Sequence, residues 1–145
     1  SELCIKFLPL WEQNTSIYKE IKNLTLLKYD SNSYLVGRYV KWEINFLKHL
    51  GYGLNINKCC VTGELNNTYF ISPKTGNAVN FEVGKKYSKY LFKIPMCMKE
   101  NFKKNYYNDY KEALKITEYF FLKILENNKF KFIFRNQIIN KLRVL

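Results

Sequence analysis

Apolar residues between Leu35 and Leu50 recur at intervals of three and four, and this stripe constrains the fold more than any other feature. Its members are Leu35, Tyr39, Trp42, Phe46 and Leu50. This spacing places all five side chains on one face of an α-helix, which must pack against other elements. Gly51 supplies the left-handed residue that commonly ends a helix, and Gly53 gives a further turn. We therefore predict a helix that ends near Leu50 and buries Trp42 in the core.

The same periodicity predicts further helices on both sides of this one. Thr15 or Ser16 can cap a first helix, and Ser31 or Ser33 can cap the central one. A later helix carries a stripe of Tyr110, Ala113 or Leu114, Thr117, Phe121 and Leu125. A last helix is expected near Arg135–Val144. The charged residues that fall largely off the central stripe are Arg38, Lys41, Glu43 and Lys48.

Helical periodicity breaks between about residues 54 and 95, where glycine, proline and asparagine punctuate the chain. Two short strands are predicted there, around Cys60–Thr62 and Tyr69–Ser72, followed by a helix from Lys85 to Leu91. The predicted fold is mainly α: a helical bundle with an irregular insert at about 54–95 that contains a short β-hairpin. The sequence predicts one domain over residues 1–145.

The positive charge of the chain is concentrated in its C-terminal part. The sequence carries 24 Lys and Arg against 12 Asp and Glu, a formal net charge of +12. Residues 85–145 hold fifteen of these basic residues and five of the acidic ones. Such a basic half favours a polyanionic or acidic partner, such as nucleic acid or an acidic peptide. The alternative is a solvated lysine surface inflated by the codon usage of an AT-rich genome.

Lysines and tyrosines interleave in this basic half. Lys85, Lys89 and Lys93 are spaced by four, which would align them on one face if the segment is helical. Ammonium groups neutralise phosphates, and exposed tyrosines can stack on unpaired bases. The candidate contacts to nucleic acid or to an acidic tail are Lys85, Lys86, Lys89, Lys93, Lys103 and Lys104. The interleaved tyrosines, which we instead expect to pack inward, are Tyr87, Tyr90, Tyr106 and Tyr107.

No arrangement of residues predicts catalysis or a metal site. The sequence lacks GxSxG, HExxH, P-loop and GxGxxG motifs. His49 is the one histidine, and Cys4, Cys59, Cys60 and Cys97 form no CxxC pair. We therefore predict a non-enzyme without a cofactor, whose cysteines stay reduced in the cytoplasm. No uncharged run is longer than nine residues, so no membrane span is predicted.

Three blocks of sequence carry a family resemblance. They are Phe46-Leu-Lys-His-Leu-Gly-Tyr-Gly-Leu54, Cys59-Cys-Val-Thr-Gly-Glu64 and Tyr69-Phe-Ile-Ser-Pro-Lys-Thr-Gly-Asn-Ala-Val79. Together they resemble the bacterial recombination mediator RecO, in its C-terminal helical part, and weaker flanking matches extend the resemblance over nearly the whole chain. The positions that match the family motif, and for which it implies structural roles, are Gly51, Gly53, Cys59, Thr62, Gly63, Ser72, Pro73 and Gly76.

Two departures from the family pattern accompany this resemblance. Many members carry four zinc cysteines in the insert, whereas here Cys59 fills the first position and Thr62, Asn80 and Val83 stand at the others. One remaining ligand cannot form a tetrahedral thiolate site, so the resemblance implies a remnant of a zinc-binding loop without zinc. The family also has an N-terminal OB-fold, which carries much of its DNA binding, and we expect this chain to comprise only the C-terminal helical part without that fold.

The resemblance implies a cytoplasmic protein of the RecF pathway of DNA repair. Such a protein helps to load recombinase on single-stranded DNA coated by single-strand-binding protein, and it anneals strands. The implied partners are single-stranded DNA, the acidic C-terminal tail of single-strand-binding protein, and RecR. Two alternatives stay open: a stand-alone basic helical module that binds nucleic acid without single-strand-binding protein, and an enzyme with a divergent site.

Overall fold

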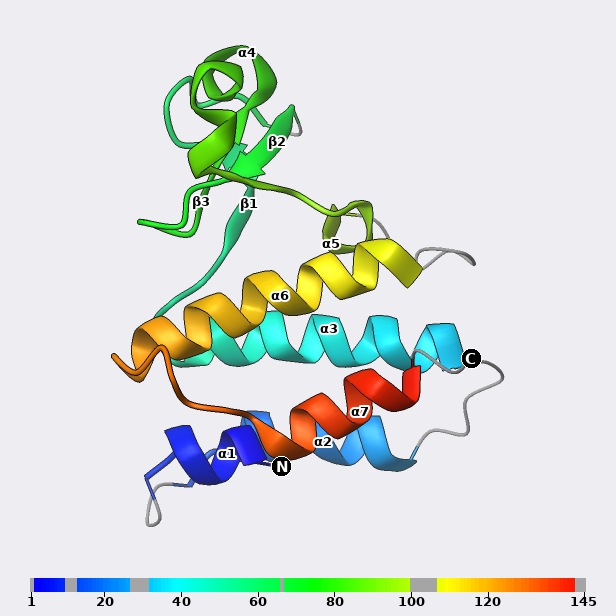
Figure 1. The fold of residues 1–145 in the computed structure, drawn as a ribbon. Helices are drawn as coiled ribbons and strands as arrows, with labels where there is room; N and C mark the ends of the chain where they lie inside the picture. Colours follow the sequence, from blue (N-terminus) through cyan, green and yellow to red (C-terminus); the bar gives the residue numbers. More distant parts are fainter. Residues whose placement is uncertain (1, 10–12, 27–31, 66, 100–106, 143–145) are drawn as a thin grey trace.

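The computed structural model describes residues 2–9, 13–26, 32–65, 67–99 and 107–142. It is mainly α, as predicted, with a small sheet that stands on one side of the helices (Figure 1). The helices are α1 (Glu2–Phe7), α2 (Thr15–Leu26), α3 (Asn32–His49), α4 (Phe81–Gly84), the 3₁₀ helix η1 (Lys85–Tyr90), α5 (Met96–Lys99), α6 (Tyr107–Ile124) and α7 (Ile133–Leu142). The strands are β1 (Asn55–Cys59), β2 (Thr68–Ile71), β3 (Asn77–Asn80) and β4 (Phe92–Lys93).

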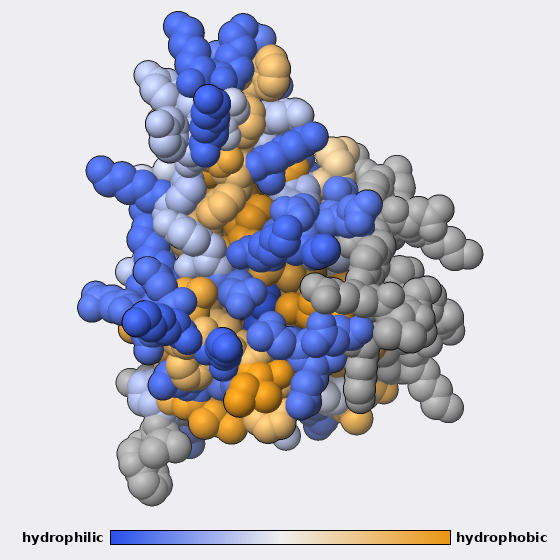
Figure 2. All heavy atoms as spheres, viewed as in Figure 1, coloured by the Kyte–Doolittle hydropathy of each residue, from blue (hydrophilic) through white to orange (hydrophobic). Residues whose placement is uncertain are grey.

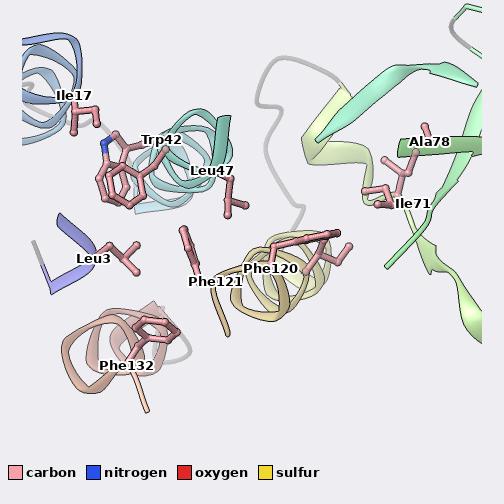
Figure 3. Packing of buried hydrophobic residues seen from close by; sticks show 12 residues of the cluster. Leu3, Ile17, Trp42, Leu47, Ile71, Ala78, Phe120, Phe121 and Phe132 are labelled. Atoms are coloured by element: carbon pink, nitrogen blue, oxygen red, sulfur yellow. The ribbon is translucent and has the colours of Figure 1, made fainter. Parts of the chain in front are cut away.

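Helices α3 and α6 lie side by side and run in the same direction, and α7 runs back against them (Figure 1). Trp42 is 4% exposed and stacks between Tyr39 and Phe46, with ring centroids 5.7 and 5.3 Å away. The predicted core position of Trp42 is therefore confirmed. Phe121 points from α6 into this helical core, whereas Phe120 points toward Ile71 of the sheet (Figure 3).

The central helix ends as the glycine pattern predicted. Gly51 has φ +82°, its N–H donates to the Lys48 carbonyl at 3.1 Å, and the Tyr52 N–H donates to the Leu47 carbonyl at 2.9 Å. These two hydrogen bonds form a Schellman motif, which satisfies the last carbonyls of the helix. Gly53, by contrast, has no positive φ.

The sheet has four strands in the order β1-β3-β2-β4, where the sequence predicted a two-stranded hairpin. Strands β2 and β3 form the antiparallel hairpin, β1 pairs parallel with β3, and β4 pairs antiparallel with β2. The strand predicted at Cys60–Thr62 is wrong. This segment is a turn, because the Gly63 N–H donates to the Cys59 carbonyl and Gly63 has φ +75°.

The Ser-Pro-Lys-Thr-Gly motif forms the turn of the β2–β3 hairpin. The Ser72 N–H donates to the Asn77 carbonyl at 2.9 Å, and Gly76 takes the left-handed conformation at φ +72°. Lys123 of α6 donates to the carbonyls of Pro73 and Lys74 at 3.0 and 2.6 Å. This lysine fastens the tip of the hairpin to the helical bundle, which fixes the position of the insert.

Glu43 is buried, although it is a charged residue that lies off the predicted apolar stripe. Its side chain is 0% exposed and forms an ion pair with Arg135 of α7, which is 1% exposed.

Glu2 also contacts α7, because its carboxylate accepts hydrogen bonds from the N–H groups of Ile133, Phe134 and Arg135 at 3.0–3.2 Å. A carboxylate at this place satisfies amides that the first turn of α7 leaves unpaired.

Candidate nucleic-acid interface

Four of the six predicted lysines lie on a single segment of the insert, which runs from α4 through η1 to β4. The Asn80 side chain caps α4 by accepting the Val83 N–H at 3.0 Å. Gly84 then lies so close to Phe70 of β2 that a Cβ at this position would overlap the ring. At the other end of the segment, Lys93 pairs with Phe70 across β4 and β2. The lysine segment is therefore held against β2 at both ends.

Lys85, Lys86 and Lys89 are exposed on η1, and Lys93 is exposed on β4. The predicted alignment of lysines four residues apart is wrong. A 3₁₀ helix has three residues per turn, so residues four apart do not share a face, and Lys93 lies on a strand. Lys103 and Lys104 lie outside the described residues. The structure thus brings four of the predicted lysines onto one segment, in a different arrangement.

The four lysines differ in how far their charge is already neutralised. Lys85 Nζ lies 2.7 Å from Glu82 Oε2, and Lys93 Nζ lies 5.3 Å from the centroid of the Tyr69 ring. Within the described ranges, no carboxylate pairs with Lys86 or Lys89. These two ammonium groups are the ones most available to an anionic partner. Hydrophilic side chains gather over this part of the molecule, at the top of Figure 2.

The tyrosines of this segment do not pack inward, contrary to the sequence-based expectation. Tyr87 is 59% exposed and Tyr90 is 77% exposed. The inward positions of this segment are instead taken by Gly84, which is buried against Phe70, and by Leu91, which is half-buried. Tyr106 and the side chain of Tyr107 lie outside what the structure describes.

The positions at which the resemblance places zinc ligands are joined by hydrogen bonds. Cys59 Sγ accepts the Thr62 N–H at 3.5 Å and the Asn80 N–H at 3.3 Å. Burial would raise the pKa of Cys59, but the hydrogen bonds from Thr62, Val61 and Asn80 outweigh it and lower the pKa to about 7. The Asn80 amide donates to Glu64 Oε2 at 3.0 Å and accepts from Val83.

This donor set does not fit a zinc ion, because one thiolate, an engaged amide, a hydroxyl and a valine cannot supply four ligands. Within the described ranges, no group of three or more His, Cys, Asp or Glu side chains could hold a metal ion. His49 lies at the end of α3 with its Nε2 3.9 Å from Glu20 Oε1. Cys4, Cys59, Cys60 and Cys97 form no disulfide bond with one another.

A second surface, which the sequence did not locate, is an apolar groove between α1 and the start of α7. It has a volume of about 560 Å³ and is lined by Glu2, Ile5, Lys6, Phe130 and Phe134. Ile5 is 81% exposed and Phe134 is 63% exposed. Figure 2 shows apolar side chains gathered near the lower edge of the molecule, in this region.

The charges around this groove are mostly positive. Lys6 Nζ lies 4.8 Å from the centroid of the Phe130 ring, and the exposed Lys129 and Lys131 flank that phenylalanine in the chain. The carboxylate of Glu2 is turned to the amides of α7, whose positive helix end offsets its charge. We refer to Ile5, Lys6, Phe130 and Phe134 as the α1–α7 groove.

Comparison with known proteins assigns this helical domain and its lysine-bearing insert to a class of DNA repair proteins. The DNA repair protein RecO of Wolbachia pipientis (strain wPip) is 34% identical over 131 residues, which are 86% of this chain and 54% of that protein. The RecO of Ehrlichia chaffeensis is 36% identical over 108 residues, covering 70% of this chain and 44% of that protein. The chain thus spans about half the length of the curated relatives that it matches.

The family model described as "Recombination protein O C terminal" matches residues 1–131. The chain therefore belongs to the RecO family, in its C-terminal part, as the resemblance indicated. No solved structure matches the chain significantly. In the described part of the chain, no helix is long and apolar enough to cross a membrane.

Proposed function

We propose that this chain acts in DNA repair by recombination, as the C-terminal part of a mediator that works on single-stranded DNA. The proposal rests on the lysine segment, which is held against β2 at both ends. Among the described residues, no carboxylate pairs with Lys86 or Lys89 of this segment. Free ammonium groups on a fixed segment attract phosphates and release counterions on binding. Membership of the RecO family supports the same role.

In this role the protein helps to load a recombinase on single strands coated by single-strand-binding protein, and it anneals complementary strands. Its proposed protein partners are single-strand-binding protein and RecR. These steps are non-covalent and need no catalytic group or cofactor in this chain. The four cysteines of the chain form no disulfide bond, which fits a cytoplasmic location. The alternative is a stand-alone basic module that binds nucleic acid and does not act with single-strand-binding protein.

The test compares two variants with the same change in charge. Lys85, Lys86, Lys89 and Lys93 are replaced together by Gln in the first, and the exposed Lys19, Lys22, Lys41 and Lys48 of α2 and α3 in the control. The first variant should bind single-stranded DNA more weakly and with a flatter dependence on salt, because fewer phosphates are neutralised. The control should behave like the parent. Equal loss in both variants would show that only total charge matters, and the lysine segment would not be the interface.

The α1–α7 groove is where we propose that the acidic tail of single-strand-binding protein docks. The exposed side chains of Ile5 and Phe134 give this groove an apolar surface, and Lys6 also lines the groove. This combination complements a peptide that carries carboxylates beside a bulky apolar residue, since charge guides the encounter and apolar anchors give affinity.

A labelled tail peptide tests this docking site by fluorescence anisotropy. Phe134→Asp and Lys6→Gln should each weaken binding of the peptide, whereas Leu65→Asp, at a similarly exposed apolar side chain of the insert, should not. Size-exclusion chromatography with light scattering checks a different occupant. A dimer of the parent that Phe134→Asp converts to monomer would show that a second copy covers the groove instead. An annealing assay on strands coated by single-strand-binding protein distinguishes the two candidate functions. A mediator should need the acidic tail of single-strand-binding protein for annealing, whereas a stand-alone module should not.

A further inference from the structure

The sequence of η1 repeats with the same period as the helix that it forms. The six residues are Lys-Lys-Tyr-Ser-Lys-Tyr, so the dipeptide Lys86-Tyr87 returns as Lys89-Tyr90 after three residues. A 3₁₀ helix completes a turn every three residues, and side chains at i and i+3 therefore lie one above the other. Lys86 and Lys89 form one column along η1, and Tyr87 and Tyr90 form the adjacent column. In an α-helix, with 3.6 residues per turn, the two members of each pair would be offset around the helix axis by about 60°.

The rings of Tyr87 and Tyr90 are exposed to solvent. Tyr87 and Tyr90 are 59% and 77% exposed, and within the described residues neither ring contacts another ring or makes a hydrogen bond. Other aromatic residues at this side of the molecule are engaged: Tyr69 packs edge-on against Phe81 at 5.2 Å, and Tyr119 against Phe92 at 5.1 Å. Two neighbouring rings left open on a soluble domain indicate a surface that binds something flat and apolar.

The two columns fit the two halves of a nucleotide. A rise of about 2.0 Å per residue separates the attachment points of the two rings by roughly 6 Å, so each ring is free to take its own base. In a duplex, bases are covered by neighbours about 3.4 Å away, and their faces are closed to the rings. Lys86 and Lys89, one turn apart beside the rings, can reach the phosphates of the same strand.

We propose that η1 binds unpaired nucleic acid, with Tyr87 and Tyr90 stacking on successive bases and Lys86 and Lys89 contacting the backbone. This inference rests on the proposed function and adds the form of nucleic acid that the segment selects, together with the residues that select it. The segment is preorganised for this role, because Gly84 packs on Phe70 at one end and β4 pairs with β2 at the other. Little ordering is then needed when the strand binds.

The experiment uses the whole 145-residue chain and two labelled strands of equal length, an oligothymidylate and an abasic strand with the same phosphates. The parent should bind the oligothymidylate at least about fivefold more tightly, because each base stacked on an aromatic ring adds that much or more. Tyr87→Ala with Tyr90→Ala should abolish this preference and leave binding of the abasic strand unchanged. Lys86→Gln with Lys89→Gln should weaken binding of both strands and flatten the dependence on salt.

The matched control is Tyr18→Ala with Tyr52→Ala, two exposed tyrosines of α2 and of the turn after α3. This control should keep the preference of the parent, and thermal melting checks that every variant is folded. If the parent binds both strands equally, stacking is wrong while phosphate binding by the lysines still stands. If the parent binds neither strand, the proposed function fails as well. A loss of preference in the control as large as in the Tyr87 and Tyr90 variant would place the stacking elsewhere and overturn the proposal.

Discussion

Arg135 and Glu43 form a two-point ion pair in the centre of the helical bundle, although they lie 92 residues apart in the sequence. Arg135 Nε is 2.7 Å from Glu43 Oε1, and Arg135 Nη2 is 3.1 Å from Glu43 Oε2. Arg135 Nη1 also reaches Glu118 Oε2 at 3.1 Å, so one guanidinium joins α3, α6 and α7. Burial would lower the pKa of Arg135, but Glu43 outweighs this effect and raises it, so the guanidinium stays charged.

Removing one partner of this pair should be strongly destabilising. Arg135→Met leaves the Glu43 carboxylate buried without its counter-charge, and such losses typically cost about 3–5 kcal/mol of unfolding free energy. Urea denaturation measures the change. The double variant Arg135→Met with Glu43→Leu should recover part of the loss, because it removes both buried charges. Losses that simply add in the double variant would contradict the coupling between the two residues.

Trp42→Ala should lower the free energy of unfolding but should remove no contact to nucleic acid. The indole is 4% exposed and packs between Tyr39 and Phe46 in the hydrophobic core. Emptying a large buried aromatic site costs roughly 3–5 kcal/mol. Chemical denaturation measures this loss, and Phe46→Leu serves as a milder core control. A stable Trp42→Ala variant that had lost only its affinity for DNA would refute the assignment of this residue to the core.

Glu126→Gly should stabilise the protein, which is unusual for a substitution by glycine. Glu126 has φ +52° at the end of α6, where its N–H donates to the Lys123 carbonyl and the Asn127 N–H donates to the Leu122 carbonyl. A side chain in the left-handed region costs about 1 kcal/mol, which glycine avoids. We expect the melting temperature to rise by a few degrees. The reverse exchange, Gly51→Ala at φ +82°, should lower the melting temperature. If both substitutions changed the melting temperature in the same direction, backbone strain at these positions would not be the cause.

The helices could be predicted because the information for them is local. The stripe from Leu35 to Leu50 and the glycine at position 51 define α3 within one stretch of sequence, and the structure confirms both. The strands are different, since β4 has two residues and β1 is recognised only through its pairing with β3. Such pairing depends on contacts between distant segments, which propensity does not report. The extra strands of the sheet were therefore missed.

The sequence identified the lysines of the candidate interface but did not predict how the structure arranges them. Charge alone located the lysines of η1, but spacing by four could not distinguish an α-helix from a 3₁₀ helix. The Lys-Tyr repeat of period three was the signal that could have found the tighter helix. The burial of Glu43 was not predicted, for another reason. A charged residue beside the stripe resembles a surface residue until its partner, Arg135, is known from the fold.

Cys59 should make the stability of the protein depend on pH between about pH 7 and pH 9. Its pKa is lowered to about 7 in the folded chain from an ordinary value of 9.0, because hydrogen bonds from Thr62, Val61 and Asn80 outweigh burial. The folded state therefore binds fewer protons than the unfolded state in this range, and stability rises as pH rises. The gain is complete above the unfolded pKa and is lost as pH falls through the folded pKa.

Urea denaturation at several pH values measures this dependence, with Cys59→Ser as the comparison. The difference in unfolding free energy between parent and variant should grow by roughly 3 kcal/mol from below pH 7 to above pH 9. Cys60→Ser, which replaces the exposed neighbouring thiol, serves as the control and should follow the parent. A difference that stays constant over this range would show that the Cys59 thiol titrates as it does in the unfolded chain.

The purified chain should contain no stoichiometric zinc, and a chelator should leave its melting temperature unchanged. Cys59 is the one thiol among the four positions at issue, and the Asn80 amide is already engaged by Glu64 and Val83. Elemental analysis measures the metal content. As a positive control, Thr62→Cys, Asn80→Cys and Val83→Cys together place three thiols beside Cys59, and this variant should bind about one zinc per chain. Zinc in the parent at a comparable level, with unfolding on its removal, would show that other ligands hold a metal in the insert.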